Sequence, residues 1–141
     1  MFENSDIALL IEVFGFHKDN KIEGRTRIQK EICLLKFKSK MPFTFGYKSY
    51  YYGPYSEELS ETINTLVGVK LLKENITGVG YNSYRYDYTL TKEGKLLFER
   101  ICGKPNHRMK KLRKEIMALE NIRTPTLVAL AKEASGLDSV C

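Results

Sequence analysis

The sequence predicts an α+β fold, and three observations indicate it. Apolar residues recur at helical spacing near the N-terminus, beginning with Ile7, Leu10, Ile11 and Phe14. The stretch YRYDYTL, residues 84–90, alternates tyrosine with polar residues and is typical of a β-strand. Helical spacing returns afterwards in KEGKLLFERI and KPNHRMKKLRKEIMALENI. A chain of 141 residues is large enough to bury a core of its own.

Two helices are expected before residue 40. Asn4 or Ser5 can cap the first, and Gly15 with the polar run HKDNK ends it. The second should open after Gly24, in GRTRIQKEICLLKFK, and bury one apolar face. Its first turns are crowded with cations: Arg25, Arg27 and Lys30. Cations at a helix N-terminus oppose the helix dipole by a few tenths of a kcal/mol each, so these residues either have a function or form a solvated basic face.

A strand-to-helix corner follows. The segment FTFGYKSYYY, residues 43–52, is aromatic and β-prone, and predicts a short strand or an extended arm. Gly53 and Pro54 break it. Ser56 is then a good N-cap for a third helix, and Glu57 and Glu58 lie where the helix dipole favours negative charge. These glutamates therefore need no catalytic explanation.

A β-hairpin and a fourth helix complete the pattern. We expect 71–76 and 84–90 to pair antiparallel around the loose turn TGVGYNS, and Thr91 to cap the next helix. The order helix, helix, short strand, helix, hairpin, helix is that of a winged helix-turn-helix, in which a three-helix core carries a two-stranded β-wing. We assign 1–102 to this winged-helix domain and 103–141 to a basic C-terminal helical extension.

The extension contains a stripe of apolar residues. The stripe has 3-4-3 spacing and consists of Met109, Leu112, Ile116 and Leu119. It is too short for a coiled coil but sufficient for an interface. Because the winged-helix core should already close near Cys102, we expect the stripe to pack between two subunits of a homodimer.

Charge and cysteine content restrict the class of protein. The net charge is +6 and the pI about 9.2, with basic blocks on both sides of an acidic one, which suggests a polyanionic partner. Three cysteines without CxxC spacing and two histidines favour a reduced cytoplasmic location and no metal site. The sequence shows no membrane-spanning run and no export signal.

Catalytic motifs are absent from the sequence. It contains no P-loop, no G-x-G-x-x-G, no G-x-S-x-G and no H-E-x-x-H. His17 and His107 both lie in polar stretches, where we expect them to be exposed, and neither adjoins a plausible nucleophile and acid. We therefore expect a protein that is not an enzyme and needs no cofactor.

Several short motifs carry a family resemblance. GRTRIQK with an apolar run, then YYGPYSEEL, LLKE and YTLTKEG, run in order from about Gly24 to Gly94. This pattern resembles the YwgA-like winged-helix proteins of bacteria and archaea, and more distantly the Panacea antitoxin domain. The resemblance implies a winged-helix fold, whose relatives mostly bind DNA, while the antitoxin relatives bind proteins.

The function expected from the sequence is that of a winged-helix DNA-binding protein, a transcriptional regulator acting on double-stranded DNA. The candidate nucleic-acid-binding residues are Arg25, Arg27, Lys30, Lys48, Tyr52, Ser56 and Arg85. The alternative is a non-enzymatic protein-interaction module of the antitoxin kind, with Tyr55 and the apolar stripe as partner-binding residues. It is favoured by Glu57, Glu58 and Glu61, because the third helix would enter the major groove with carboxylates leading. A third alternative is a nucleic-acid accessory protein of a virus or mobile element, because the chain is small and basic.

Overall fold

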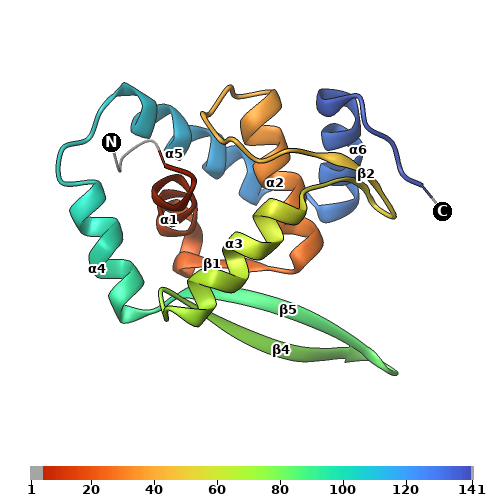
Figure 1. Cartoon of the computed structure of the whole chain (residues 1–141), viewed down its shortest axis with the longest axis horizontal. Coiled ribbons are helices and arrows are strands. Elements are labelled where there is room, and N and C mark those ends of the chain that lie inside the picture. The colour runs from red at the N-terminus through yellow and green to blue at the C-terminus, as the bar shows by residue number, and fades with distance from the viewer. Residues whose placement is uncertain (1–4, 141) are drawn as a thin grey trace.

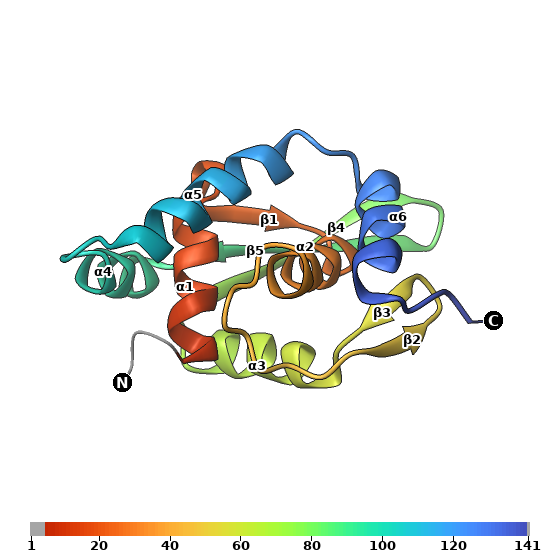
Figure 2. The same cartoon turned by 90° about the horizontal axis from the view of Figure 1, so that it is seen from above.

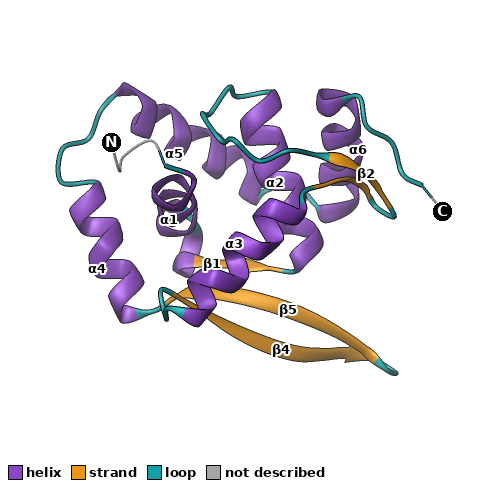
Figure 3. Ribbon diagram, in the orientation of Figure 1, coloured by secondary structure: helices purple, strands orange, loops and turns teal. Residues whose placement is uncertain are grey.

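The computed structural model describes residues 5–140, which form an α+β structure of helices around two small antiparallel sheets (Figures 1 and 3). In chain order the elements are α1 (Asp6–Phe16), η2 (Lys18–Asn20), β1 (Lys21–Glu23), α2 (Arg25–Phe37), β2 (Lys48–Tyr50), β3 (Gly53–Tyr55), α3 (Glu57–Gly68), β4 (Leu72–Gly80), β5 (Ser83–Leu90), α4 (Lys92–Ile101), α5 (His107–Glu120) and α6 (Thr124–Ser135). None of the helices in the described part of the chain is long and apolar enough to cross a membrane.

Capping residues fix where the helices begin, as the sequence predicts. The hydroxyls of Ser5, Ser56 and Thr91 accept hydrogen bonds from backbone amides three residues later, at 3.0–3.1 Å, and so begin α1, α3 and α4. Helix α2 begins after Gly24, whose φ of 99° lies in the region that glycine tolerates. The predicted starts of these four helices are confirmed.

The longest strands form the expected hairpin. Strands β4 and β5 pair antiparallel from Leu72↔Leu90 to Gly78↔Tyr84, which confirms the predicted pairing. The hairpin extends further than expected, because β4 continues to Gly80 and only two residues form the turn. Its free end projects away from the helices (Figure 1). The sequence analysis missed β1, a strand of three residues that pairs with β5 and completes a sheet of order β1-β5-β4.

A second hairpin joins α2 to α3. The predicted arm becomes β2, and the Gly-Pro segment, which we interpreted as a break, forms β3. Gly53 opens β3 with a φ of 94°. The C-terminal segment lies along the outer edge of this hairpin, where the Val140 amide donates to the Tyr50 carbonyl at 2.9 Å. Because this edge is paired, the hairpin is held by the C-terminus of the chain.

The predicted role of the apolar stripe as a subunit interface is wrong, because the stripe is buried within its own chain. Met109, Leu112, Ile116 and Leu119 are 0–8% exposed, and three of them join the same hydrophobic core as α1 and α2. The stripe therefore does not offer an apolar face to a second subunit. The expected boundary at residue 103 does not separate two cores either, because α5 and α6 complete the core formed by the preceding residues.

Helix α6 was not predicted from the sequence. It packs against α2 and β3 (Figure 2). Its buried residues are Leu127 and Ala131. Two signals mark it in retrospect: a proline in its first turn and Gly136 at its end, with a φ of 74°. Its contact with β3 holds the β2–β3 hairpin in place, and this hairpin forms one wall of the candidate site.

Candidate functional site between α2, α3 and the β2–β3 hairpin

A cavity lies between α2, α3 and the β2–β3 hairpin, with β5 contributing one residue. Its volume is about 320 Å³. It is lined by Arg25, Thr26, Ile28, Gln29, Lys30, Tyr50, Tyr52, Tyr55, Leu59, Ser60, Ile63, Asn64 and Tyr88. The lining combines two cations, four tyrosines and a few apolar side chains, and contains no Asp or Glu. A cavity of this size with convergent polar groups is the form that small-ligand sites take.

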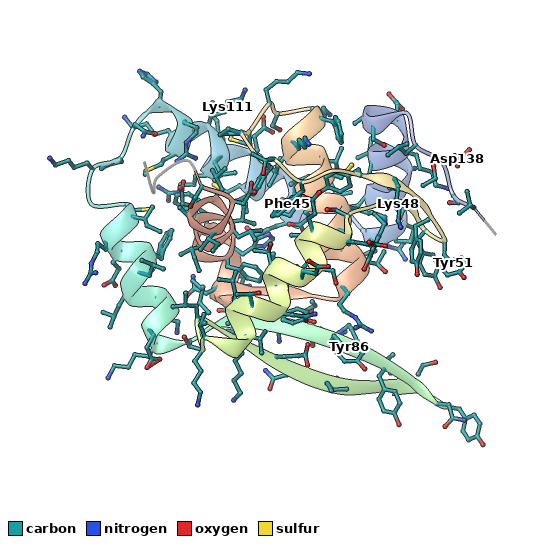
Figure 4. All side chains as sticks on the ribbon, viewed as in Figure 1. Phe45, Lys48, Tyr51, Tyr86, Lys111 and Asp138 are labelled. Atoms are coloured by element: carbon teal, nitrogen blue, oxygen red, sulfur yellow. The ribbon has the colours of Figure 1, made fainter. Side chains whose placement is uncertain are left out.

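The N-terminus of α2 forms one wall. Arg25 is exposed, and its guanidinium carbon lies 3.7 Å from the centre of the Tyr86 ring on β5 (Figure 4 labels Tyr86). Within the described chain no side chain caps α2, because the N-cap residue is Gly24. The first-turn amides of α2 and the positive end of its dipole therefore favour an anion at this wall.

Lys30 lies in the second turn of α2 and lines the same cavity. Its side chain is buried, with the residue 2% exposed, and its Nζ donates to the Pro54 carbonyl at 2.9 Å. Burial lowers the pKa of Lys30 to about 8; the nearby Cys33 raises this pKa, and Lys132 on α6 lowers it further. Within residues 5–140, no carboxylate lies within 4 Å of this ammonium. The predicted role of Lys30 in contacting DNA from the surface is therefore wrong, because the ammonium lies inside the cavity wall.

Tyrosines of the hairpin form the opposite wall. The rings of Tyr50 and Tyr55 stack with centroids 4.6 Å apart, and Tyr51 adds a tilted contact to Tyr50 at 4.7 Å. Tyr52 at the turn is 65% exposed and also reaches the cavity. Figure 4 shows Tyr51 at the outer end of this hairpin. Tyr52 and Tyr55, both predicted as site residues, are thus brought together, and Tyr50 is a neighbour that the sequence analysis did not select.

Gln29 joins α2 to the start of α3. Its Nε2 donates to the Ser56 carbonyl at 2.9 Å, and its Oε1 accepts from the Ser56 amide at 2.8 Å. Ser56 is fully buried and its hydroxyl caps α3. The predicted contact of Ser56 with nucleic acid is therefore wrong: its polar atoms are used by the fold.

Arg27 also differs from its predicted role. Its guanidinium donates to the Leu119 and Ile122 carbonyls, both at 2.8 Å, and its Nε lies 2.8 Å from the Glu31 carboxylate. These contacts hold the α5–α6 connection against α2. Arg27 is thus turned inward and joins the helices of the core, and it is unavailable to phosphates.

The same buried network contains His17, which we expected to be exposed. Its Nε2 is 2.7 Å from Glu31 Oε1, and the residue is 6% exposed. The polar sequence around His17 misled the prediction, because a histidine in a polar turn can still face a buried carboxylate on a distant helix.

The two remaining predicted cations are paired on the surface. Lys48 lies 2.6 Å from Glu57, a hydrogen bond that raises the pKa of Lys48 and lowers that of Glu57. Arg85 contacts Asp87 at 2.8 Å and Glu23 at 3.1 Å. Both side chains remain solvent-accessible, so they can exchange these partners for phosphates, but at the loss of the existing pairs.

Helix α3 presents an acidic and neutral surface beside the cavity. Glu58 accepts from the Gly46 amide at 2.7 Å and so anchors the loop before β2. Glu61 is exposed, as are Asn64 and Thr65 one turn later. The next exposed cations, Lys70 and Lys73, follow the C-terminal end of α3.

A separate basic surface lies on α5. Lys110 and Lys114 are exposed on its outer side, and Lys111 donates to the Ser39 carbonyl at 2.9 Å. Figure 4 shows Lys111 at the edge of the molecule opposite the β4–β5 hairpin. The basic tail predicted from the sequence therefore faces away from α3.

The comparisons with known proteins add one relative. No family model matches the chain, and no solved structure matches it. The chain is similar to the uncharacterized protein YwgA of Bacillus subtilis strain 168, with 40% identity over 85 residues. The match covers 60% of this chain and 49% of that protein, so the chain spans about half the length of this relative. The resemblance to YwgA-like proteins that the sequence motifs predict is therefore supported over more than half of the chain.

Proposed function

We propose that this is a non-enzymatic winged-helix protein that binds double-stranded DNA, as a transcriptional regulator does. One observation carries the proposal. The order α1, β1, α2, α3, β4, β5, with a sheet of order β1-β5-β4, places a projecting hairpin next to the third helix. In winged-helix proteins this helix and this hairpin are the elements that meet the duplex. The net charge of +6 supports a polyanionic partner.

The residues proposed to contact phosphates differ from those predicted from the sequence. Lys30 and Ser56 are removed because they are buried, and Arg27 is removed because its guanidinium is bonded to the Leu119 and Ile122 carbonyls. Arg25, Lys48 and Arg85 remain, since each reaches solvent. Lys70 and Lys73 are added, because they are exposed at the end of α3 and the start of β4. About five phosphate contacts should make log K fall with log salt at a slope of roughly −4 to −5.

The test is fluorescence anisotropy of a labelled duplex as a function of salt. The double variant Arg25→Ala, Lys73→Ala should reduce the slope by about two units and weaken binding to all sequences alike. The control removes the same charge from the opposite face, as Lys110→Ala, Lys114→Ala, and should leave the slope unchanged. A wild-type protein that does not bind duplex DNA at ~50 mM salt would refute the proposal. A slope that responds only to the α5 control would refute the proposed surface.

A second candidate is a protein-interaction module of the antitoxin kind. It is favoured by the carboxylates on the first turns of α3 together with highly exposed aromatic rings, Tyr81 at 94% and Tyr84 at 64%, on the neighbouring hairpin. Exposed tyrosines suit protein interfaces, whereas carboxylates repel phosphates. Glu61→Gln separates the two: it should strengthen DNA binding if α3 meets the duplex, and leave it unchanged if α3 meets a protein.

A further inference from the structure

We propose that the cavity between α2, α3 and the β2–β3 hairpin binds a small planar molecule that bears one anionic group, a phosphate or a carboxylate. The anionic group lies at the N-terminus of α2, beside Arg25 and Lys30, and the ring lies against the hairpin tyrosines. This inference does not depend on DNA binding, because it concerns a small molecule in a cavity that opens to solvent.

The anion end is formed by one side of α2. Arg25 with Gln29 and Thr26 with Lys30 form two i, i+4 pairs on adjacent rows of the helix, and all four residues line the cavity. The helix is 13 residues long, and within the described chain no side chain caps its N-terminus. A guanidinium and first-turn amides at a helix N-terminus together recognise phosphate and carboxylate oxygens.

Lys30 supports an anion site independently of the helix N-terminus. It is a buried cation whose contacts within residues 5–140 include one carbonyl, that of Pro54, and no carboxylate. An ammonium has three donors, so two remain for a ligand in the cavity that Lys30 lines. Buried charges in proteins are normally paired with an opposite charge. An anion in this cavity would supply the missing counter-charge.

The β2–β3 hairpin forms the part of the cavity where we place the ring of the ligand. The stacked Tyr50 and Tyr55 present aromatic surface, and Tyr52 at the turn is exposed and able to cover a bound ring. Leu59 and Ile63 of α3 add apolar contacts. The volume of about 320 Å³ lies at the lower end of the roughly 300–1,000 Å³ typical of ligand pockets, which fits a small molecule. The side-chain amide of Gln29 is already bonded to Ser56, so polar substituents of the ring would meet Ser60 and Asn64 instead.

The experiment titrates the whole chain with four probes: phenyl phosphate (a monophosphate ester), benzoate, inorganic phosphate and phenol. Binding is followed by calorimetry and by the backbone amide shifts of residues 25–30 and 50–55. We expect the monophosphate or benzoate to bind and to shift these amides. The better of the two identifies the anionic group as phosphate or carboxylate. Inorganic phosphate and phenol, which each lack one half of the ligand, should bind at least tenfold more weakly.

Three variants test the residues. Arg25→Gln and Tyr52→Leu change exposed side chains, so they should fold normally and weaken binding about tenfold. Lys30→Met should abolish binding, and its folding is checked by circular dichroism because Lys30 also holds Pro54. Arg113→Gln removes an exposed cation from α5 and should bind as the wild type does.

Two results would overturn the proposal. One is the absence of shifts at residues 25–30 with either anionic ring compound at millimolar concentration. The other is an affinity that is the same in Arg25→Gln as in Arg113→Gln. Inorganic phosphate binding as tightly as the monophosphate would refute the aromatic half of the site. None of the four probes is a DNA duplex. If none of them binds, the small-molecule proposal fails, and the proposal that the protein binds DNA is still tested separately by the anisotropy experiment.

Discussion

Arg27→Ala tests whether this arginine joins the helices of the core or serves a partner. In the structure its guanidinium donates to the Leu119 and Ile122 carbonyls and pairs with Glu31. The substitution removes these contacts together. It leaves the Glu31 carboxylate, which is fully buried, with His17 as its remaining close partner.

The expected loss of stability is large. Breaking a buried ion pair by removing one partner costs about 3–5 kcal/mol. We expect the lower end, about 3 kcal/mol, because His17 still contacts Glu31 and the Arg27 side chain is 15% exposed. An unfolding entropy of roughly 2.1 cal/mol/K per residue gives about 0.3 kcal/mol/K for 141 residues, so Tm should fall by about 10 °C.

The assay combines thermal unfolding with amide hydrogen exchange. Arg27→Ala should accelerate exchange throughout α6, because the residues that connect it to α5 lose their anchor. Arg113→Ala is the matched control: this arginine is exposed, and its loss should change stability by less than about 0.5 kcal/mol. A Tm within about 2 °C of the wild type would show that the inward contacts of Arg27 contribute little, and would refute the reasoning.

Three further predictions follow from packing and charge. Gly15→Ala should destabilise the protein by about 1–3 kcal/mol in urea unfolding, because a Cβ at this position would lie 2.1 Å from the Phe98 ring. Gly68→Ala is the control and should not destabilise the protein, because a Cβ at Gly68 would have no atom within 4 Å. Deleting residues 104–141 should unfold the chain rather than release a folded monomer, since it removes part of the core; a folded product in circular dichroism would contradict this. Lys30→Met should be more stable than the wild type at pH 7, and the difference should shrink by about 3 kcal/mol between pH 8 and 10.5. Between pH 8 and 10.5 the unfolded wild type still carries the Lys30 proton, whereas the folded wild type, with its pKa near 8, has lost it. The stability of the wild type therefore rises with pH in this window. A stability difference between the two proteins that does not change with pH would contradict the lowered pKa of Lys30.

The sequence predicted those features that depend on near neighbours along the chain. Ser5, Ser56 and Thr91 begin their helices because a capping hydroxyl bonds an amide only three residues away. The alternation of YRYDYTL likewise predicts β5, since side chains of a strand point to opposite faces. Strand β1 was missed because its three residues carry too little periodicity, and only pairing with β5 makes them a strand.

What only the tertiary structure decided is which charged side chains face solvent. Arg25, Arg27 and Lys30 are indistinguishable in a sequence pattern, yet the first lies on the surface, the second binds the α5–α6 connection and the third lies inside a cavity wall. Lys30 donates to a carbonyl 24 residues away, Arg27 to one 95 residues away, and Arg25 lies over the ring of Tyr86 on a distant strand. The sequence by itself thus determined helices α1 to α5, the main hairpin and the overall positive charge, but not α6. The site required the fold, because the burial and pairing of a charge depend on groups that long-range packing brings together.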